Sequence, residues 1–200
     1  YLVNKIKLKH IIIGYDHRFG KGREASVLDL KKYSGEFNFI VDEIDAQEIE
    51  KIAISSTKIR NSINNGDLET TKKYLGRFFS LTGKVIKGDG LGKLIDYPTA
   101  NILIEENYKI IPKDGVYFIK TSIDNKLYKG MMNIGHRPTI GKKEKSIEVN
   151  LFNFDRDIYN KIISVDVVMK IRDEKKFSSI EDLKVQLAKD KEHCLKFINK

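Results

Sequence analysis

Gly88-Asp-Gly-Leu-Gly-Lys-Leu-Ile-Asp-Tyr-Pro-Thr-Ala-Asn101 is the stretch that decides how the longer part of this chain is interpreted, because a glycine-rich loop runs directly into a strand. Glycines at alternate positions let a backbone approach a bulky anion without interference from Cβ atoms. Thr99 and Asn101 are two residues apart, so on an extended strand their side chains share one face. Such neutral oxygens bind hard cations like Mg²⁺, which usually share their ligands with substrate phosphates. The stretch predicts a place for a metal–nucleotide complex.

Two common phosphate-binding patterns do not fit this loop. Gly83 to Gly88 is followed by Asp89 instead of Lys-Ser/Thr, so the Walker pattern fails. The glycines at 88, 90 and 92 do not have the G-x-G-x-x-G spacing either. The plain alternative is a flexible hairpin loop and a proline turn that enter a strand whose Thr and Asn are merely polar. The spacing alone favours this alternative.

The composition limits the class of protein. Two hundred residues with 40% hydrophobic content suit one large or two small domains with real cores. The net charge of +9 and the pI near 9.4 favour phosphate-bearing partners. Only seven of the 37 cationic residues are Arg, and they are spread along the chain. A solvated, Lys-rich surface is therefore the first interpretation of the charge.

Cysteine usage and hydropathy indicate the compartment. The single Cys194 excludes an intramolecular disulfide and suits a reducing cytoplasm, where we expect it to pack in a C-terminal helix instead of reacting. No apolar stretch approaches the ~20 residues of a membrane span, and the chain start does not resemble a signal peptide. We therefore expect a cytoplasmic protein without a membrane partner.

The first segment alternates strands and helices. We expect a buried strand at His10–Gly14, a helix at Glu24–Tyr33 and a second strand at Phe37–Val41. A helix through Thr57–Ile63, capped by Ser55 or Ser56, and a last helix that ends at Leu75-Gly76 should follow, separated by Gly66-Asp67. The alternation predicts an α/β layer with a parallel sheet.

From Phe78 on, short strand-like runs replace the helices. They cover 79–87, 101–104, 115–123, 127–134, 146–154 and 162–171, with turns at Asp124-Asn125 and a loop at 136–145. This spacing predicts an antiparallel barrel or sandwich. A closing helix at 179–198 has Ser179 as its cap and Leu183, Leu187, Leu195 and Ile198 as its core face. The seam near Gly76–Ser80 divides the chain into domains 1–77 and 78–200.

Residues from about 78 to 200 resemble the riboflavin kinase domain, which is the C-terminal half of bacterial bifunctional riboflavin kinase/FAD synthetases. The matching pieces occur in the family's order. They are the glycine-rich flap, Tyr97-Pro-Thr-Ala-Asn101, Gly115-Val-Tyr117, Asn133-Ile-Gly-His-Arg-Pro-Thr139, Ile147-Glu-Val-Asn150, Ile171-Arg172 and Phe177. The resemblance implies a small antiparallel β-barrel with a C-terminal helix. It also implies transfer of the terminal phosphoryl group of ATP to riboflavin, which yields FMN, with Mg²⁺ accompanying the ATP.

The resemblance also assigns roles to the central residues. Thr99 and Asn101 would hold Mg²⁺ between the nucleotide phosphates, and Glu148 would be the catalytic base that takes the proton of the attacking hydroxyl. The alternation of apolar and polar residues alone places Glu148, between Ile147 and Val149, on the solvent-exposed face of a strand. The flap would bring the glycines Gly88, Gly90 and Gly92, together with Lys93, over the phosphates.

Two positions depart from the family's pattern. Lys93 stands where Arg is usual, which keeps the charge but loses the bidentate fork. Asp96 stands where Gly is usual; it tolerates unusual backbone angles better than most residues but adds a negative charge near phosphate. We expect weaker nucleotide binding from both departures.

Further site residues are less specific. Asn133 and Arg137 would shape the nucleotide pocket, although Arg137 equally fits a surface-loop cation. Tyr117 and Arg172 would bind the flavin, but Arg172 equally fits a pair with Asp173 and Glu174. His136 is interpreted as a loop residue and not as a ligand, because no second His or Cys has the spacing to share a metal with it.

Residues 1 to about 77 resemble the C-terminal part of the FMN adenylyltransferase domain, a Rossmann-like α/β nucleotidyltransferase domain. The marks are Gly14-Tyr-Asp-His-Arg-Phe-Gly20 and Ile54-Ser-Ser-Thr-Lys-Ile-Arg60. In that superfamily the second motif binds ATP phosphates at a helix start, through residues that match Ser55, Ser56, Thr57 and Arg60. Helix capping explains the same hydroxyls equally well. Asp16 would face the flavin.

The superfamily's His-x-Gly-His signature is missing, since the four histidines lie at 10, 17, 136 and 193. The chain also has no initiator Met and opens inside what looks like a helix that leads into a strand. We therefore expect an N-terminally truncated piece that makes FMN but no FAD unaided, derived from a parent that carries out both reactions.

Two other classes of function remain open. One is a non-catalytic barrel that binds nucleotide or flavin. The other is a basic barrel that binds nucleic acid, which needs exposed aromatic side chains beside cations. Phe152, Phe154 and Tyr117 follow strand alternation and fit a core or a flavin pocket better, so we expect no nucleic-acid partner. The oligomeric state is not predicted.

Overall fold

The computed structural model describes residues 2–46, 48–49, 52–88, 90, 92, 95–139 and 142–197; the side chains of 48, 49, 52, 137–139 and 142–144 are outside the description. The chain forms two compact units, Tyr1–Ile54 and Ser55–Lys200. Each unit has its own buried apolar cluster.

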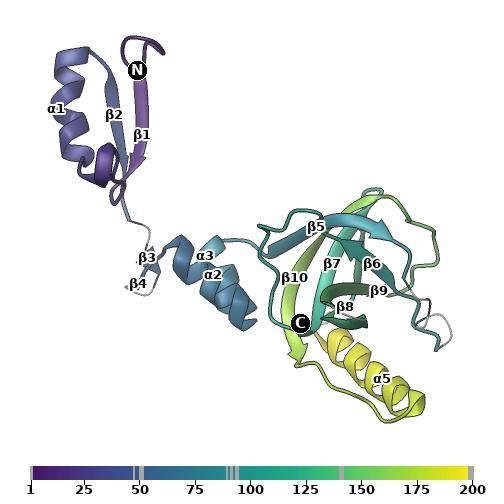
Figure 1. Ribbon diagram of the computed structural model, residues 1–200. Coiled ribbons are helices and arrows are strands. Elements are labelled where there is room, and N and C mark those ends of the chain that lie inside the picture. Colours follow the sequence, from purple (N-terminus) through teal and green to yellow (C-terminus); the bar gives the residue numbers. More distant parts are fainter. Residues whose placement is uncertain are drawn as a thin grey trace. The chain divides into compact units, whose positions relative to one another are not determined.

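The first unit is a strand–helix–strand layer (Figure 1). Its two longer strands pair in parallel, and the helix buries Val27 and Leu30 against Ile13 and Phe39. Helix α1 (Val27–Phe37) begins later than the sequence predicts because Ser26 and Asp29 form its capping box, in which the Ser26 N–H donates to the Asp29 carboxylate at 2.7 Å. The parallel α/β prediction is confirmed. The elements are β1 (His10–Gly14), the 3₁₀ turn η1 (Lys21–Arg23), α1 (Val27–Phe37), β2 (Ile40–Ile44), β3 (Glu48–Ile49) and β4 (Ile52–Ala53).

The second unit begins with a helical hairpin, α2 (Ser56–Asn65) and α3 (Leu68–Leu75). The cap of α2 is Ser55, whose hydroxyl accepts the Lys58 N–H at 3.3 Å. Leu68 is 3% exposed and belongs to the core of the barrel that follows. The structure therefore groups this hairpin with the barrel, whereas the sequence places the seam after residue 77.

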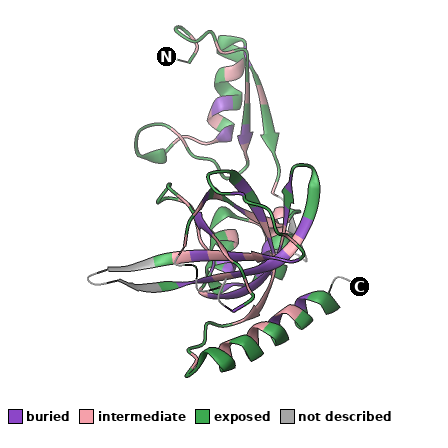
Figure 2. Cartoon of the chain, turned by 90° about the vertical axis from the view of Figure 1, so that its right-hand side faces the viewer, coloured by how far each residue is buried: buried purple, intermediate pink, exposed green. Residues whose placement is uncertain are grey.

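Six antiparallel strands close into a barrel in the order β10-β5-β6-β9-β8-β7 (Figure 1). Side chains alternate along each strand, so one set fills the interior and the other faces outward. In Figure 2 the buried residues are concentrated in these strands. The barrel prediction is thus confirmed. The strands are β5 (Phe79–Ile86), β6 (Ala100–Leu103), β7 (Gly115–Ile123), β8 (Lys126–Thr139), β9 (Lys142–Leu151) and β10 (Ile162–Arg172).

The prediction of a loop at 136–145 is wrong over its described residues. The ladder between β8 and β9 continues through His136↔Lys145 to Thr139↔Lys142. The segment lacks the apolar alternation of a half-buried strand, and an antiparallel hairpin that extends beyond its core does not require that alternation.

Helix α5 (Ile180–Lys196) covers part of the outer face of the barrel. A second apolar cluster lies between them and contains Val116, Phe118, Met131, Phe152 and Cys194. Burial raises the pKa of the Cys194 thiol to about 12, and the charge of Asp190 adds to this effect. The packing role expected for this cysteine is confirmed by its 0% exposure.

The predicted core face of the closing helix needs one correction. Leu183 and Leu187 are half-buried, as expected, but Leu195 is 42% exposed. Cys194 takes the inner position because it continues the 3.6-residue period from Leu187, while Leu195 is turned away by a further 100°. Ile198, the last member of the predicted face, lies outside the described residues.

Candidate active site

A continuous row of residues crosses the barrel wall. Asn101 on β6 lies opposite Glu148 on β9, and Glu148 lies opposite Asn133 on β8. The row continues from Asn133 to Val116 on β7 and from Val116 to Arg172 on β10. Directly opposite residues of an antiparallel ladder point to the same face, with Cβ atoms roughly 4.5–5.5 Å apart. The ladder thus brings together four of the residues proposed from the sequence.

This row faces away from the barrel interior. The sequence neighbours of Glu148, Ile147 and Val149, belong to the interior cluster, and so do the neighbours of Asn133. By the period of two, Glu148 and Asn133 point outward. The strand periodicity therefore predicted correctly that the Glu148 side chain points out of the barrel. This part of the outer face is covered, however, and not open to solvent.

A cavity of about 290 Å³ lies over this row. Thr99, Asn133, Glu148 and Arg172 all line it, together with Gly92 of the flap. Helix α5 and the segment after β10 close it with apolar side chains. Its apolar lining is Ile95, Tyr97, Val116, Met131, Phe177, Leu183 and Leu187, and its remaining polar lining is Asn150, Glu174 and Lys175.

The flap approaches Thr99 closely at Gly92. A Cβ atom at Gly92 would lie 2.3 Å from the Tyr97 carbonyl oxygen and 3.1 Å from Thr99 Oγ1. The Tyr97 N–H also donates to the Gly92 carbonyl at 2.8 Å. Glycine is therefore required where the loop turns over Thr99.

The other flap residues are placed as follows. Gly88 follows the end of β5, and Gly90 has a left-handed backbone with φ of 76°. Asp96 also has a positive φ, 63°, which explains why glycine suits this position. Its side chain is 93% exposed, with the carboxylate 4.0 Å from Lys184 Nζ. Lys93 lies outside the described residues.

Asn150 was not singled out in the sequence as a site residue. Its amide Nδ2 donates to the Pro98 carbonyl at 2.8 Å, and its side chain also lines the cavity. This bond holds the segment that carries Thr99 against β9. Its position two residues after Glu148, on the same face of the strand, was the available signal.

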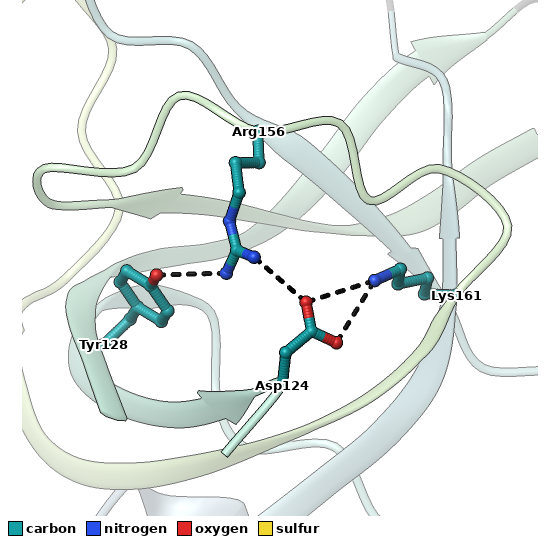
Figure 3. Close-up of polar contacts among 4 residues, drawn as sticks. All are labelled: Asp124, Tyr128, Arg156 and Lys161. Atoms are coloured by element: carbon teal, nitrogen blue, oxygen red, sulfur yellow. Dashed lines mark hydrogen bonds and ion pairs between the residues drawn. The ribbon is translucent and has the colours of Figure 1, made fainter. Parts of the chain in front are cut away.

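Thr99 also lines a second cavity, of about 410 Å³, beside Phe154, Arg156 and Tyr159. Arg156 was missed in the sequence, and Figure 3 shows how it is held. Its guanidinium donates to Asp124 Oδ2 and to the Tyr128 hydroxyl, both at 3.0 Å. Lys161 Nζ binds the same carboxylate at 3.3 Å.

Arg172 has a partner that the sequence did not reveal. Its Nε lies 2.9 Å from Asp190 Oδ2, and its Nη1 donates to the main-chain oxygen of Asp173 at 3.0 Å. The carboxylate of Asp173 instead accepts from Lys170 at 2.6 Å, and this bond holds the pKa of Asp173 below its usual value. The pairing considered from the sequence is corrected to Asp190, which no local spacing links to Arg172.

Tyr117 lies inside the barrel and not in the cavity. It is 0% exposed, belongs to the interior cluster, and donates its hydroxyl proton to the Lys113 carbonyl. Burial raises the pKa of this phenol well above its usual value. Arg137 lies in β8 opposite Glu144, and its side chain is outside the described part of the chain.

The residues proposed for an adenylyl-transfer site belong to both units. Asp16 is exposed after β1 in the first unit. Ser55, Ser56, Thr57 and Arg60 are exposed at the start of α2 in the second. The bond from the Lys58 N–H to Ser55 Oγ shows that this hydroxyl caps the helix.

In the ranges that the structure describes, no helix combines the length and hydrophobicity needed to cross a bilayer.

The fold and the cavity define a class: a small closed β-barrel with a covered polar row on its outer wall, suited to a small, partly apolar ligand. The family model for riboflavin kinase matches residues 75–198, and that for FAD synthetase matches residues 1–58. The chain belongs to the riboflavin kinase family.

Similar proteins agree with this assignment. A bifunctional riboflavin kinase/FMN adenylyltransferase of Buchnera aphidicola (from Schizaphis graminum) is 42% identical over 99% of this chain. A protein of the same name from Haemophilus influenzae is 38% identical over 99% of this chain. The chain spans 64% of the length of each of these relatives.

A solved structure shares the fold. It is that of a protein named as a macrolide-efflux protein from Streptococcus pneumoniae, and it superimposes with a TM-score of 0.80 at 37% identity. The match covers 90% of this chain and 59% of that one. This similarity supports the arrangement of elements described above.

Proposed function

We propose that residues 78–200 form a riboflavin kinase domain, which transfers the terminal phosphoryl group of ATP to the ribityl hydroxyl of riboflavin. The observation that carries the proposal is the position of Glu148, which lies opposite Asn101 and lines one cavity with Thr99. Family membership and the names of the relatives support the same reaction. Residues 1–77 are proposed to belong to an FMN adenylyltransferase domain.

Glu148 acts as the general base in this proposal. A primary alcohol is a weak nucleophile at neutral pH, and a carboxylate within hydrogen-bond reach can accept its proton as the oxygen attacks the terminal phosphorus. The bond from that phosphorus to the bridging oxygen breaks, and ADP leaves. Most of the remaining catalysis is positioning and charge neutralisation.

The residues beside Glu148 fit a magnesium ion. Thr99 supplies a hydroxyl and Asn101 an amide oxygen, both hard donors, and the pairing of β6 with β9 holds Asn101 opposite the carboxylate. When bound there, Mg²⁺ would neutralise negative charge on the ATP phosphates. Gly92 keeps the flap close to Thr99, where backbone N–H groups of the flap would meet the same phosphates.

The two cavities that Thr99 joins suit the two substrates. The cavity with Glu148 has more apolar lining, including Val116, Met131 and Phe177, and suits the flat flavin ring with Arg172 at its edge. The other cavity is lined by the aromatic side chains of Phe154 and Tyr159, with Arg156 beside Asp155 and Asp157. We assign it to the nucleotide because aromatic side chains suit the stacking of an adenine ring. Thr99 then lies between donor and acceptor, as transfer requires.

The test is an assay of the purified chain with riboflavin, ATP and Mg²⁺, in which FMN and FAD are separated chromatographically. We expect FMN to accumulate with one ADP per FMN, and no FAD. Chains that bind riboflavin but form no FMN would overturn the kinase proposal in favour of a non-catalytic flavin-binding barrel.

A further inference from the structure

Asp190 is a carboxylate buried between α5 and the barrel. It is 2% exposed and lies four residues before Cys194, on the side of the helix that packs against the barrel wall. An ionised carboxylate in such a place is very unfavourable unless charged or hydrogen-bonded partners compensate it. Its partners therefore indicate what the residue does.

The main partner is Arg172, the last residue of β10. Arg172 Nε lies 3.1 Å from Oδ1 and 2.9 Å from Oδ2 of Asp190, and Nη2 lies 2.9 Å from Oδ2. Gln186, one turn earlier on α5, donates to Oδ1 at 2.9 Å. Nε–H donates to both oxygens of this carboxylate and Nη2 makes an ion-pair contact beside it, so Asp190 fixes the plane of the guanidinium as well as its position.

The same guanidinium reaches the cavity that contains Glu148. Arg172 lines that cavity, and its Cζ lies 5.7 Å from the centre of the Phe177 ring. Hydrogen bonds to Asp190 and to the Asp173 carbonyl engage the Nε–H and one N–H of Nη1, while Nη2 makes an ion-pair contact with Oδ2. Because Arg has five N–H donors, one remains on each terminal nitrogen for a bound ligand.

We propose that Asp190 is a positioning residue for riboflavin binding, which holds the Arg172 guanidinium so that its remaining N–H groups meet the flavin in the cavity. This inference rests on the function proposed above. Asp190 itself lies behind Arg172 and touches no substrate. A flavin ring carries carbonyl and ring-nitrogen acceptors along one edge, which suits a guanidinium held in a fixed plane.

A purely structural role would give a different result. If the ion pair only fastened α5 to the barrel, its loss would lower stability without a selective effect on one substrate. Cys194 provides the comparison, because it is 0% exposed and lies one turn further along the same side of α5. Cys194→Ala weakens the packing of this helix and leaves the Arg172–Asp190 pair in place.

The experiment compares Asp190→Ala, Asp190→Asn and Cys194→Ala in the whole chain. It measures riboflavin Kd by quenching of flavin fluorescence, KM for riboflavin and for ATP, kcat and thermal unfolding. Loss of a hydrogen-bonded charge at Arg172 should raise riboflavin Kd and KM by about tenfold or more. The KM for ATP should stay within about twofold, and Cys194→Ala should lower Tm without changing riboflavin Kd. Asp190→Asn keeps the size of the side chain, so it replaces Asp190→Ala in the comparison if the alanine variant does not fold.

A double-mutant cycle completes the test. If Asp190 acts through Arg172, the double variant Arg172→Ala/Asp190→Ala should bind riboflavin no more weakly than Arg172→Ala alone. Additive losses, or a lower Tm with unchanged riboflavin Kd, would overturn the inference, and so would a wild-type chain that does not bind riboflavin. The fluorescence measurement needs no turnover. A chain that binds riboflavin but makes no FMN therefore contradicts only the kinase proposal and not the role of Asp190 in riboflavin binding.

Discussion

Glu148 lies directly opposite Asn101 in the antiparallel pairing of β9 with β6, although 46 residues separate them in the chain. Asn101 is 5% exposed, so its side chain is buried on the strand that pairs with the one carrying Glu148. The same ladder places Asn133 on the other side of Glu148. The proposed base thus has an asparagine directly opposite it on each of the two neighbouring strands.

Glu148→Gln should abolish most turnover. The amide keeps the size of the side chain but cannot accept the hydroxyl proton, so kcat should fall by about 10²–10⁴-fold while riboflavin binding changes little. Steady-state FMN formation and flavin fluorescence measure the two quantities. Glu105→Gln, at an exposed position after β6, is the matched control and should behave as the wild type. Full activity of Glu148→Gln would remove this residue from the mechanism.

Asn101→Ala should impair use of ATP more than binding of riboflavin. Loss of one hard oxygen donor should raise the Mg²⁺ concentration needed for half-maximal rate by at least about tenfold. A Mg²⁺ titration at fixed ATP and riboflavin measures this change. Asn107→Ala, in an exposed turn, is the control. A lower kcat with an unchanged Mg²⁺ dependence would argue against Asn101 as a metal ligand.

The left-handed backbone at Asp96 predicts an order of stabilities. Glycine adopts a φ of 63° without a steric penalty, whereas a β-branched residue does not. We expect Asp96→Val to be less stable than Asp96→Gly by about 1–2 kcal/mol, measured as the free energy of unfolding in urea. Equal stabilities of the two variants would contradict the left-handed conformation.

The sequence predicted the barrel strands well because each strand has one face in the core, so apolar residues alternate visibly along it. It predicted Thr99, Asn133 and Glu148 through a resemblance, but no pattern in the chain shows that their strands are neighbours. Asp190 and Arg156 were missed for the same reason: their partners, Arg172 and Asp124, lie on other elements. For Tyr117 the sequence left both a core position and a flavin pocket open, and the structure places it in the core.

Cys194 should resist thiol reagents in the folded chain. Burial raises its pKa to about 12, so at pH 8 the side chain is the neutral thiol, and the thiolate is the reactive form. Reaction with a chromogenic disulfide at pH 8 should be slow in buffer and rapid in denaturant. Rapid labelling of the folded chain would contradict the packing of α5 on the barrel.

Leu68→Ala should destabilise the barrel, although Leu68 belongs to the helical hairpin that precedes it. Its side chain is 3% exposed in the same apolar cluster as Leu81 and Val167 of the barrel strands. Removing this side chain should cost about 2–5 kcal/mol because it leaves a cavity among these residues. Leu127→Ala, on the β7–β8 hairpin at 59% exposure, is the control and should change the free energy of unfolding by less than about 0.5 kcal/mol. If both variants unfold at the same denaturant concentration as the wild type, the helical hairpin α2–α3 is not an integral part of the barrel.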